Sequence, residues 1–163
     1  MTTEAYVVFS GGNAPVTQGE SITTGYLNSV EVMSYSWGTQ NAVNLNHTKA
    51  NPTPLAFTFT KRVDAASVPL WRALLNSSYY STITISFLKQ VSVSTDASYL
   101  TYTLTNVGVS SLRHFFSAGD DVPTEEVVLV YSGAKLAYAK QNPDGSLQNP
   151  FNYGWNYVTN LPM

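Results

Sequence analysis

The sequence contains no cysteine and unusually little charge. The absence of cysteine excludes disulfide bonds, thiolate catalysis and cysteine-ligated zinc, and it leaves the redox compartment open. Asp, Glu, Lys and Arg make up 11% of the 163 residues, whereas about 25% is typical of soluble domains. Because charge is depleted at the centres of protein contacts, this composition favours a subunit that is contacted on several sides, and it would also fit a sugar-binding module.

Basic segments and long apolar segments are missing as well. The chain has 8 Lys and Arg and a net charge of −2, with no basic run. We therefore expect no nucleic-acid partner, because such a partner requires cations that displace counterions from phosphates. No apolar run is long enough to span a bilayer, so we expect no membrane insertion. The segment Met1–Phe9 lacks the cationic start and apolar core of a signal peptide and is typical of a first strand.

Residues that carry catalysis or hold metals are few. His47 and His114 are the only histidines, and they lie far apart without metal-ligand spacing. The chain has no nucleophile elbow, glycine-rich phosphate loop or HExxH pattern. The acidic segment 120–126 lacks the spacing of a calcium loop, and it predicts a solvated hairpin rather than a catalytic carboxylate pair. We therefore expect neither an enzyme nor a bound cofactor or metal.

The dominant hydrophobic period is two, which is the period of a β-strand. Large apolar side chains alternate with small or polar ones in Leu55–Thr60 and in Thr82–Phe87. This alternation predicts half-buried antiparallel strands, and it makes the chain mainly β. Further strands are expected at Tyr6–Phe9, Val30–Trp37, Ser98–Val109, Val127–Tyr138 and Gly154–Thr159.

Two of the expected strands depart from simple alternation. In Ser98–Val109 the apolar face changes between Leu104 and Val107. This change predicts a bulge or sharp coil, of the kind that bending sheets and barrels require, near Asn106 and Gly108. The other strand, 127–138, begins with apolar residues on both faces, which indicates a central strand or one covered by a neighbouring subunit. Its candidate contact residues are Val128, Leu129 and Val130.

One segment has the period of a helix. Pro69 fits a first helical turn, and Asp64 or Ser67 precedes it as a candidate cap. A helix of about two turns is unstable unless it packs against a sheet, so we expect it to lie against the strands. Its apolar residues repeat at i, i+4 in two pairs, Leu70/Leu74 and Trp71/Leu75.

Three segments are predicted to be turns or loops. Gly11-Gly12 follows a strand without a helical pattern after it, and Asn142–Gly145 is a strong turn signal in which Gly145 takes a positive φ. The segment Thr39–Pro54 has four Asn, two Pro and little periodicity. Its length marks it as a functional loop, because compact domains connect strands with fewer residues. We take five of its residues as candidate subunit contacts: Thr39, Gln40, Val43, Leu45 and His47.

A series of short motifs runs through nearly the whole chain. They are Gly19-Glu20-Ser21, Val30–Gly38, Phe57–Asp64 followed by Pro69-Leu70-Trp71, Tyr99–Val107, and Pro123–Glu126 followed by Leu129, Tyr131, Tyr138, Asp144-Gly145 and Gly154-Trp155. In order and spacing this series resembles the Hcp tube proteins of type VI secretion systems. Two features depart from that family: Gly25–Ser29 stands where a His-Lys pair is common, and the loop 39–54 lacks the charged residues common there.

The resemblance implies one domain over residues 1–163, a two-sheet β-barrel with one short α-helix. It implies that six copies form a ring and that stacked rings form the tube that a contractile sheath expels. The implied partners are further copies of the chain, sheath and spike proteins, and effector cargo carried in the ring lumen. Such a protein is made in the cytoplasm and leaves it without a signal peptide.

Two other interpretations stay open. One is a phage-tail-type tube subunit, which has the same architecture in another contractile machine. The other is a small carbohydrate-binding β-sandwich, because the 13% aromatic residues could stack on sugar rings. Against the second, we expect the aromatic residues to pack in the core and in contacts, with Trp37, Trp71 and Trp155 in the core.

Overall fold

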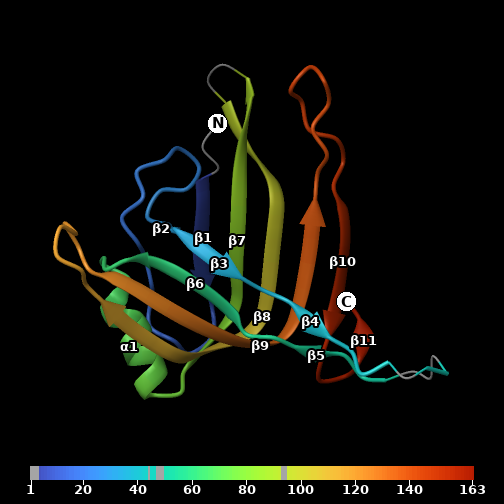
Figure 1. Ribbon diagram of the computed structural model, residues 1–163, viewed down its shortest axis with the longest axis horizontal. Coiled ribbons are helices and arrows are strands. Elements are labelled where there is room, and N and C mark those ends of the chain that lie inside the picture. Colours follow the sequence, from blue (N-terminus) through green and yellow to red (C-terminus); the bar gives the residue numbers. More distant parts are fainter. Residues whose placement is uncertain (1–3, 44, 47–49, 93–94) are drawn as a thin grey trace.

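The computed structural model describes all residues except 1–3, 44, 47–49 and 93–94 (Figure 1). The described residues form eleven strands and one helix, which confirms a mainly β fold with a short helix. The elements are β1 (Glu4–Ser10), β2 (Val30–Glu31), β3 (Ser34–Ser36), β4 (Thr39–Gln40), β5 (Thr53–Pro54), β6 (Phe57–Arg62), α1 (Ser67–Leu75), β7 (Tyr79–Ser92), β8 (Thr95–Phe115), β9 (Thr124–Tyr138), β10 (Phe151–Asn156) and β11 (Leu161–Pro162).

The strands lie in two layers that share strands β8 and β9. Five strands stand side by side in the order β10, β9, β8, β7 and β1, each antiparallel to the next, and they form an upright wall in Figure 1. The first half of β9 leaves this wall and crosses in front of it with β6 and β3 (Figure 1). The register shows the division: β9 pairs with β6 from Thr124 to Leu129 and with β10 from Gly133 to Tyr138.

Strand β8 changes its inward face where it passes from one layer to the other. Tyr102 and Leu104 are buried before this point, and Val107 and Val109 are buried after it. Between them Asn106 has φ +49°, a left-handed conformation. This residue turns the strand so that the side chains after it point to the opposite face of the sheet from the one that the alternation would give. The predicted irregularity is therefore found at Asn106 as a left-handed residue, and a register shift between β8 and β9 follows Val109.

The segment Val30–Ser36 forms two short strands instead of the single strand expected there. β2 pairs with β1, and β3 pairs with β6. Between them Val32 donates its N–H to the Ala5 carbonyl at 2.9 Å, and Met33 donates to the Thr60 carbonyl at 2.8 Å. The strand is interrupted because the chain moves from the edge of the wall to the edge of the crossing layer and so changes its hydrogen-bonding partner.

The hydrophobic core lies between the wall and the crossing layer. Phe57 and Phe59 of β6 face Ile83 and Ile85 of β7, and all four side chains are fully buried. Burial of each such side chain stabilises the fold by about 1.5–3 kcal/mol. Aromatic rings surround Tyr102 at centroid distances of 5.1–6.0 Å, namely those of Tyr35, Trp37, Phe57 and Phe87.

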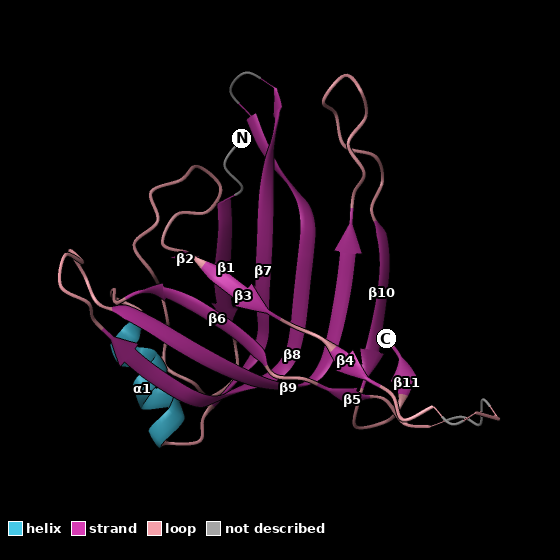
Figure 2. Cartoon of the chain, in the orientation of Figure 1, coloured by secondary structure: helices cyan, strands magenta, loops and turns pink. Residues whose placement is uncertain are grey.

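Helix α1, cyan in Figure 2, packs one face against the sheets. Its buried residues are Ser67, Leu70 and Ala73, whereas Trp71 and Leu75 are 55% and 61% exposed. The expectation that Trp71 lies in the core is therefore wrong, because its i, i+4 stripe points away from the sheet. Trp37 and Trp155 are half-buried.

The predicted helix cap is also wrong. Ala66 is the cap residue and makes no side-chain hydrogen bond to the helix. Asp64 instead accepts the N–H of Ala66 at 2.9 Å, and the N–H of Asp64 is bonded to the Ser67 hydroxyl at 3.0 Å. Both side chains stabilise the turn that leads into α1 rather than its first N–H groups.

The glycine turns form as expected. Gly11 and Gly12 have φ of +68° and +79°, and Gly145 has φ of +91°, values that glycine adopts without steric cost. The expected loop Thr39–Pro54 is different, because its two ends pair as β4 and β5. Within the described part of the chain, no helix has the length and apolar character needed to cross a membrane.

Candidate functional site

The described residues between Thr39 and Pro54 form an arm that leaves the body of the protein (Figure 1). Its base is a two-stranded sheet in which Thr39 pairs with Pro54 and Gln40 with Thr53. The Thr39 hydroxyl lies 2.7 Å from the Tyr157 hydroxyl, which fixes the base to the segment after β10. The arm is thus held at its base and extends outward from it.

The tip of the arm carries apolar side chains that are open to solvent. Val43 is 56% exposed and Leu45 is 98% exposed. Burial of one such side chain contributes about 1.5–3 kcal/mol, which is a favourable term that these residues do not gain within one chain. Four of the predicted contact residues lie on this arm, and His47 lies outside the described residues.

The first half of β9 is covered on one face only within a single chain. Leu129 is fully buried in the core, together with Val127. On the opposite face Val130 is 49% exposed and Val128 is half-buried. Of the three predicted contact residues of β9, only Val128 and Val130 therefore present side chains that a neighbouring molecule could contact. That a neighbouring subunit covers this outer face of β9 stays a prediction.

A buried polar cluster joins α1, β6, β8 and β9. The Lys61 ammonium donates to the carboxylates of Asp64 at 2.7 Å and Glu125 at 2.8 Å, and to the Ser67 hydroxyl at 3.0 Å. His114 Nε2 lies 2.5 Å from the second oxygen of Glu125. Lys61 and Glu125 are fully buried, so their charges are neutralised inside the protein by direct pairing.

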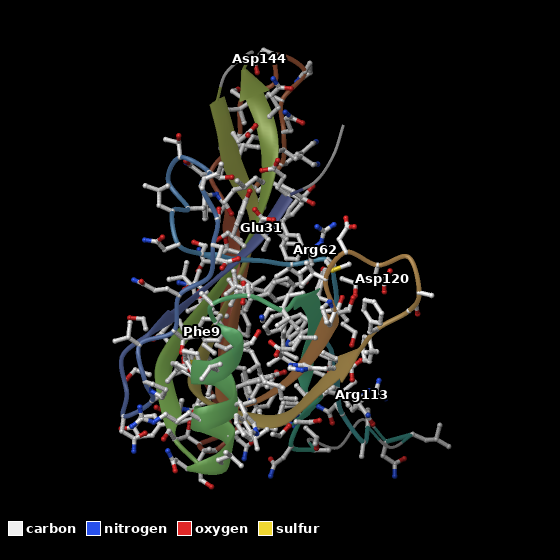
Figure 3. The ribbon with its side chains drawn as sticks, turned by 90° about the vertical axis from the view of Figure 1, so that its left-hand side faces the viewer. Phe9, Glu31, Arg62, Arg113, Asp120 and Asp144 are labelled. Atoms are coloured by element: carbon white, nitrogen blue, oxygen red, sulfur yellow. The ribbon has the colours of Figure 1, made fainter. Side chains whose placement is uncertain are left out.

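Sequence reasoning missed this cluster. The segment 120–126 was expected to be solvated, and Asp120 and Asp121 are indeed exposed at its tip, where Asp120 is labelled in Figure 3. Glu125 is the exception. Its position alternates in phase with the buried Val127 and Leu129, and that phase was the signal that an ionisable side chain points into the core.

The cluster supports the structure by joining separate elements of the fold. Among the residues that the structure describes, no group of three or more His, Asp or Glu is placed to hold a metal ion. Lys61 supplies a cation that links the turn before α1 to β9. A buried and fully paired network of this kind fixes the relative position of the elements that it joins.

Burial also changes the acidity of core tyrosines. Desolvation raises the pKa of Tyr102 well above its ordinary value, and the neighbouring Tyr35 hydroxyl at 3.0 Å adds to this rise. Burial likewise raises the pKa of Tyr131, whose hydroxyl donates to the Leu55 carbonyl at 2.6 Å at the foot of the arm. Both hydroxyls therefore stay protonated at neutral pH, and that of Tyr131 serves as a hydrogen-bond donor.

An apolar pocket lies between the base of the arm and the C-terminal half of the wall. It has a volume of about 300 Å³. Its lining is largely aromatic and aliphatic: Trp37, Thr39, Pro52, Ala134, Leu136, Tyr153, Trp155 and Tyr157. The indole N–H of Trp155 is enclosed and has no acceptor among the described residues. The pocket could accommodate a small ring-shaped group.

Comparisons with known proteins agree with this architecture. The family model described as "Type VI secretion system effector, Hcp" matches residues 6–138. Protein hcp1 of Pseudomonas aeruginosa is 31% identical over 104 residues, which make up 63% of this chain and 64% of that protein. The match therefore spans less than two thirds of the length of that relative.

Solved structures show the same fold. A type six secretion system protein of known structure superposes with a TM-score of 0.89 at 22% identity, covering 99% of this chain and 100% of the other. Hcp1 from Salmonella typhimurium superposes with a TM-score of 0.78 at 20% identity, covering 100% of both chains. At these identities the likeness establishes the fold. Because the family model spans most of the sequence, the chain belongs to the Hcp family of type VI secretion proteins.

Proposed function

We propose that the chain is the repeating subunit of a type VI secretion inner tube. Six copies form a ring, rings stack, and the contractile sheath expels the stack. The observation that carries this proposal is the arm, which projects from the body with Leu45 98% exposed at its tip. Such a projection is suited to a heterologous contact, in which one patch of each copy meets a different patch of the next.

The proposal includes closure of the single domain 1–163 into a β-barrel. Its support is the segment Val30–Ser36, which bonds to β1 at one end and to β6 at the other. A sheet without free edges on that side would give each subunit a rigid body, as repeated contacts in a ring require. Partners outside the ring are sheath and spike proteins, and the lumen carries effector cargo.

On this proposal the protein is made in the cytoplasm and leaves it inside the machine, without a signal peptide. Export through a contractile tube also requires that a subunit stay folded in two compartments. The absence of cysteine supports this, because the fold then depends on no disulfide that the change of compartment would reduce or oxidise.

The test is the mass and shape of the purified protein in solution. Size-exclusion chromatography with light scattering should give six protomers of 17.8 kDa each, and negative-stain images of the same peak should show rings. A Val43→Asp/Leu45→Lys variant should elute later, because a charged tip opposes burial, whereas the exposed change Thr24→Asp, away from the arm and from β9, tests for a general effect of charge. A monomer at every concentration would contradict the proposal.

A phage-tail-type tube subunit of another contractile system has the same geometry. Co-purification of this chain with the sheath protein of a type VI system, or with that of a phage-like tail, would distinguish these two interpretations.

The aromatic pocket favours a second candidate, a carbohydrate-binding module. Trp37, Trp155 and Tyr153 line it, and aromatic faces are suited to stacking against the C–H groups of sugar rings. Titration with a panel of oligosaccharides should then quench tryptophan fluorescence, and the Trp155→Phe variant should lose that response. No change in fluorescence with any sugar would dismiss this candidate.

A further inference from the structure

The base of the arm is too small to set the direction of the arm by itself. Strands β4 and β5 contain two residues each, and their register joins only Thr39 to Pro54 and Gln40 to Thr53. A two-stranded sheet is marginally stable in water without further support. Contacts outside β4 and β5 are therefore needed to hold the arm in one direction.

Two tyrosines of the body contact the two feet of the arm, which are Thr39 on one side and Leu55 on the other. The Tyr157 hydroxyl lies 2.7 Å from the Thr39 hydroxyl. The Tyr131 hydroxyl donates to the Leu55 carbonyl at 2.6 Å. Each foot of the arm thus has its own hydrogen bond to the body of the protein.

These two tyrosines contact each other, and each is fixed in the body. Their rings lie edge to face with the centroids 6.0 Å apart. Tyr131 belongs to β9 and is 8% exposed, so the core holds its ring. The backbone N–H of Tyr157 donates to the Ser132 carbonyl at 2.8 Å. We call this pair the tyrosine latch, because hydrogen bonds from fixed rings restrain the arm relative to the body.

The C-terminal segment places Tyr157 beside the arm. Tyr157 begins the turn between β10 and β11, which pair with each other. The N–H of Met163 donates to the Gly154 carbonyl at 3.0 Å and closes this hairpin. The end of the chain therefore lies next to the base of the arm (Figure 1), although Thr39 and Tyr157 are 118 positions apart in the sequence.

We propose that Tyr131 and Tyr157 are positioning residues that set the direction of the arm within a single subunit. The latch does so by bonding one foot of the arm to β9 and the other to the C-terminal turn. This inference rests on the proposed tube function only for its effect on assembly. If a fraction of the arms has the direction that assembly requires, the apparent affinity between subunits falls by that fraction. A latched arm also loses less conformational entropy when subunits meet.

The test measures the direction of the arm by pulsed electron paramagnetic resonance. Because the chain has no native cysteine, spin labels can be attached through Val43→Cys on the arm and Arg72→Cys on α1, both of which are exposed positions. Doubly labelled chains are diluted into an excess of unlabelled chains, so that distances within one chain dominate the signal. With the latch intact we expect one narrow distribution of distances.

Removal of one hydroxyl should loosen the arm. Tyr157→Phe and Thr39→Val each remove one partner of the same hydrogen bond, so each should broaden the distribution, and their combination should broaden it no further. Thr39→Ser keeps the hydroxyl and should keep the distribution narrow. In unlabelled Tyr157→Phe the concentration at which half of the chains are assembled should rise about two- to tenfold, the effect of one lost hydrogen bond. The urea midpoint should not change, because Thr39 is exposed.

The matched control is Tyr153→Phe. Tyr153 lies on β10, is 64% exposed and lines the pocket at the base of the arm, but its hydroxyl has no hydrogen bond to any residue that the structure describes. This change should therefore leave the distribution narrow. Tyr131→Phe tests the other foot, and its effect should add to that of Tyr157→Phe, because the two hydroxyls hold different feet.

The outcomes separate this inference from the tube proposal. A distribution that stays narrow in both Tyr157→Phe and Tyr131→Phe would overturn the latch and leave the tube proposal standing. Equal broadening by Tyr153→Phe would overturn the latch as well, because the hydroxyls at the feet would then not be the cause. Broadening in the latch variants of a protein that stays monomeric at every concentration would support the latch and overturn the tube proposal.

Discussion

Removal of the Lys61 ammonium is the perturbation for which the structure gives the sharpest expectation. Lys61 is fully buried, and its Nζ has two carboxylate partners within 2.8 Å. In the Lys61→Met variant Glu125 keeps His114 and the hydroxyl of Ser67 as partners, and Asp64 keeps the hydrogen bond from the N–H of Ala66 in the turn before α1. Two negative charges then remain in or near the core without the cation that balanced them.

The expected loss of stability is large. Breaking a buried ion pair by removing one partner costs about 3–5 kcal/mol, because an uncompensated charge stays behind. With a dependence on urea of about 1–3 kcal/mol per molar, such a loss lowers the unfolding midpoint by roughly 1–5 M. The contribution is a substantial part of the 5–15 kcal/mol that is typical of whole domains.

The assay is equilibrium unfolding in urea, followed by tryptophan fluorescence at one fixed protomer concentration, since assembly adds stability that depends on concentration. The matched control is Arg113→Met, which breaks a pair with Glu126 at 3.3 Å whose arginine side chain is 65% exposed. Exposed pairs of this kind contribute about 0–1 kcal/mol.

A double variant sharpens the comparison. Lys61→Met/Glu125→Leu removes both fully buried charges, so it should be more stable than Lys61→Met alone. The reasoning fails if Lys61→Met costs no more than Arg113→Met, or if the loss in the double variant equals the sum of the two single losses. Either result would mean that the cluster does not balance charge in the core as its geometry indicates.

Three further expectations follow from the fold. Leu129→Asp should unfold the protein, whereas Val128→Asp should leave the free energy of unfolding within about 1 kcal/mol of wild type and reduce the assembled fraction; equal effects of both on stability would contradict the two-faced description of β9. Gly12→Ala should cost about 1–3 kcal/mol in the same urea assay, since its positive φ and the nearby Tyr79 carbonyl leave no room for a Cβ; an unchanged midpoint would contradict this. Burial raises the pKa of Tyr102, so the folded form keeps a proton that the unfolded form loses above about pH 10, and the contribution of Tyr102 should lower stability as the pH rises above that value. The check is a pH titration that records tyrosinate absorbance together with circular dichroism. If every tyrosine ionised near its ordinary pKa while the circular dichroism still showed a folded protein, the expectation would be contradicted.

The elements of the fold were largely predictable because strand patterning is local. Alternation in Leu55–Thr60 and Thr82–Phe87 identified β6 and β7 through the residues that face the core. The change of face in β8 was also visible, since Asn106 stands between two runs of opposite phase. The interruption after β2 was not predictable, because it depends on which strand each half of Val30–Ser36 pairs with.

The candidate site was predictable only in outline. The arm was identified by its length and composition, and Leu45 proved to be its most exposed apolar residue. The exposure of Trp71 was missed, because a two-turn helix with apolar residues all round does not reveal which stripe meets the sheet. The buried cluster was missed for a related reason: pairing of Lys61 with Glu125 joins residues 64 positions apart, and no local pattern connects them.

The order of the strands has a consequence for how the chain folds. Strands β7, β8 and β9 are consecutive in sequence and pair with their immediate neighbours, so this meander can form from short-range hairpins. Strands β1 and β6 precede the meander, yet they pair with β7 and β9 across long loops, and closing such loops slows folding to the range of milliseconds to seconds. Until β6 docks, one edge of β9 stays open beside the apolar Val128 and Val130. Protection of this edge of β9 thus depends on a contact distant in sequence, and an unpaired edge of this kind is a template for pairing with another chain.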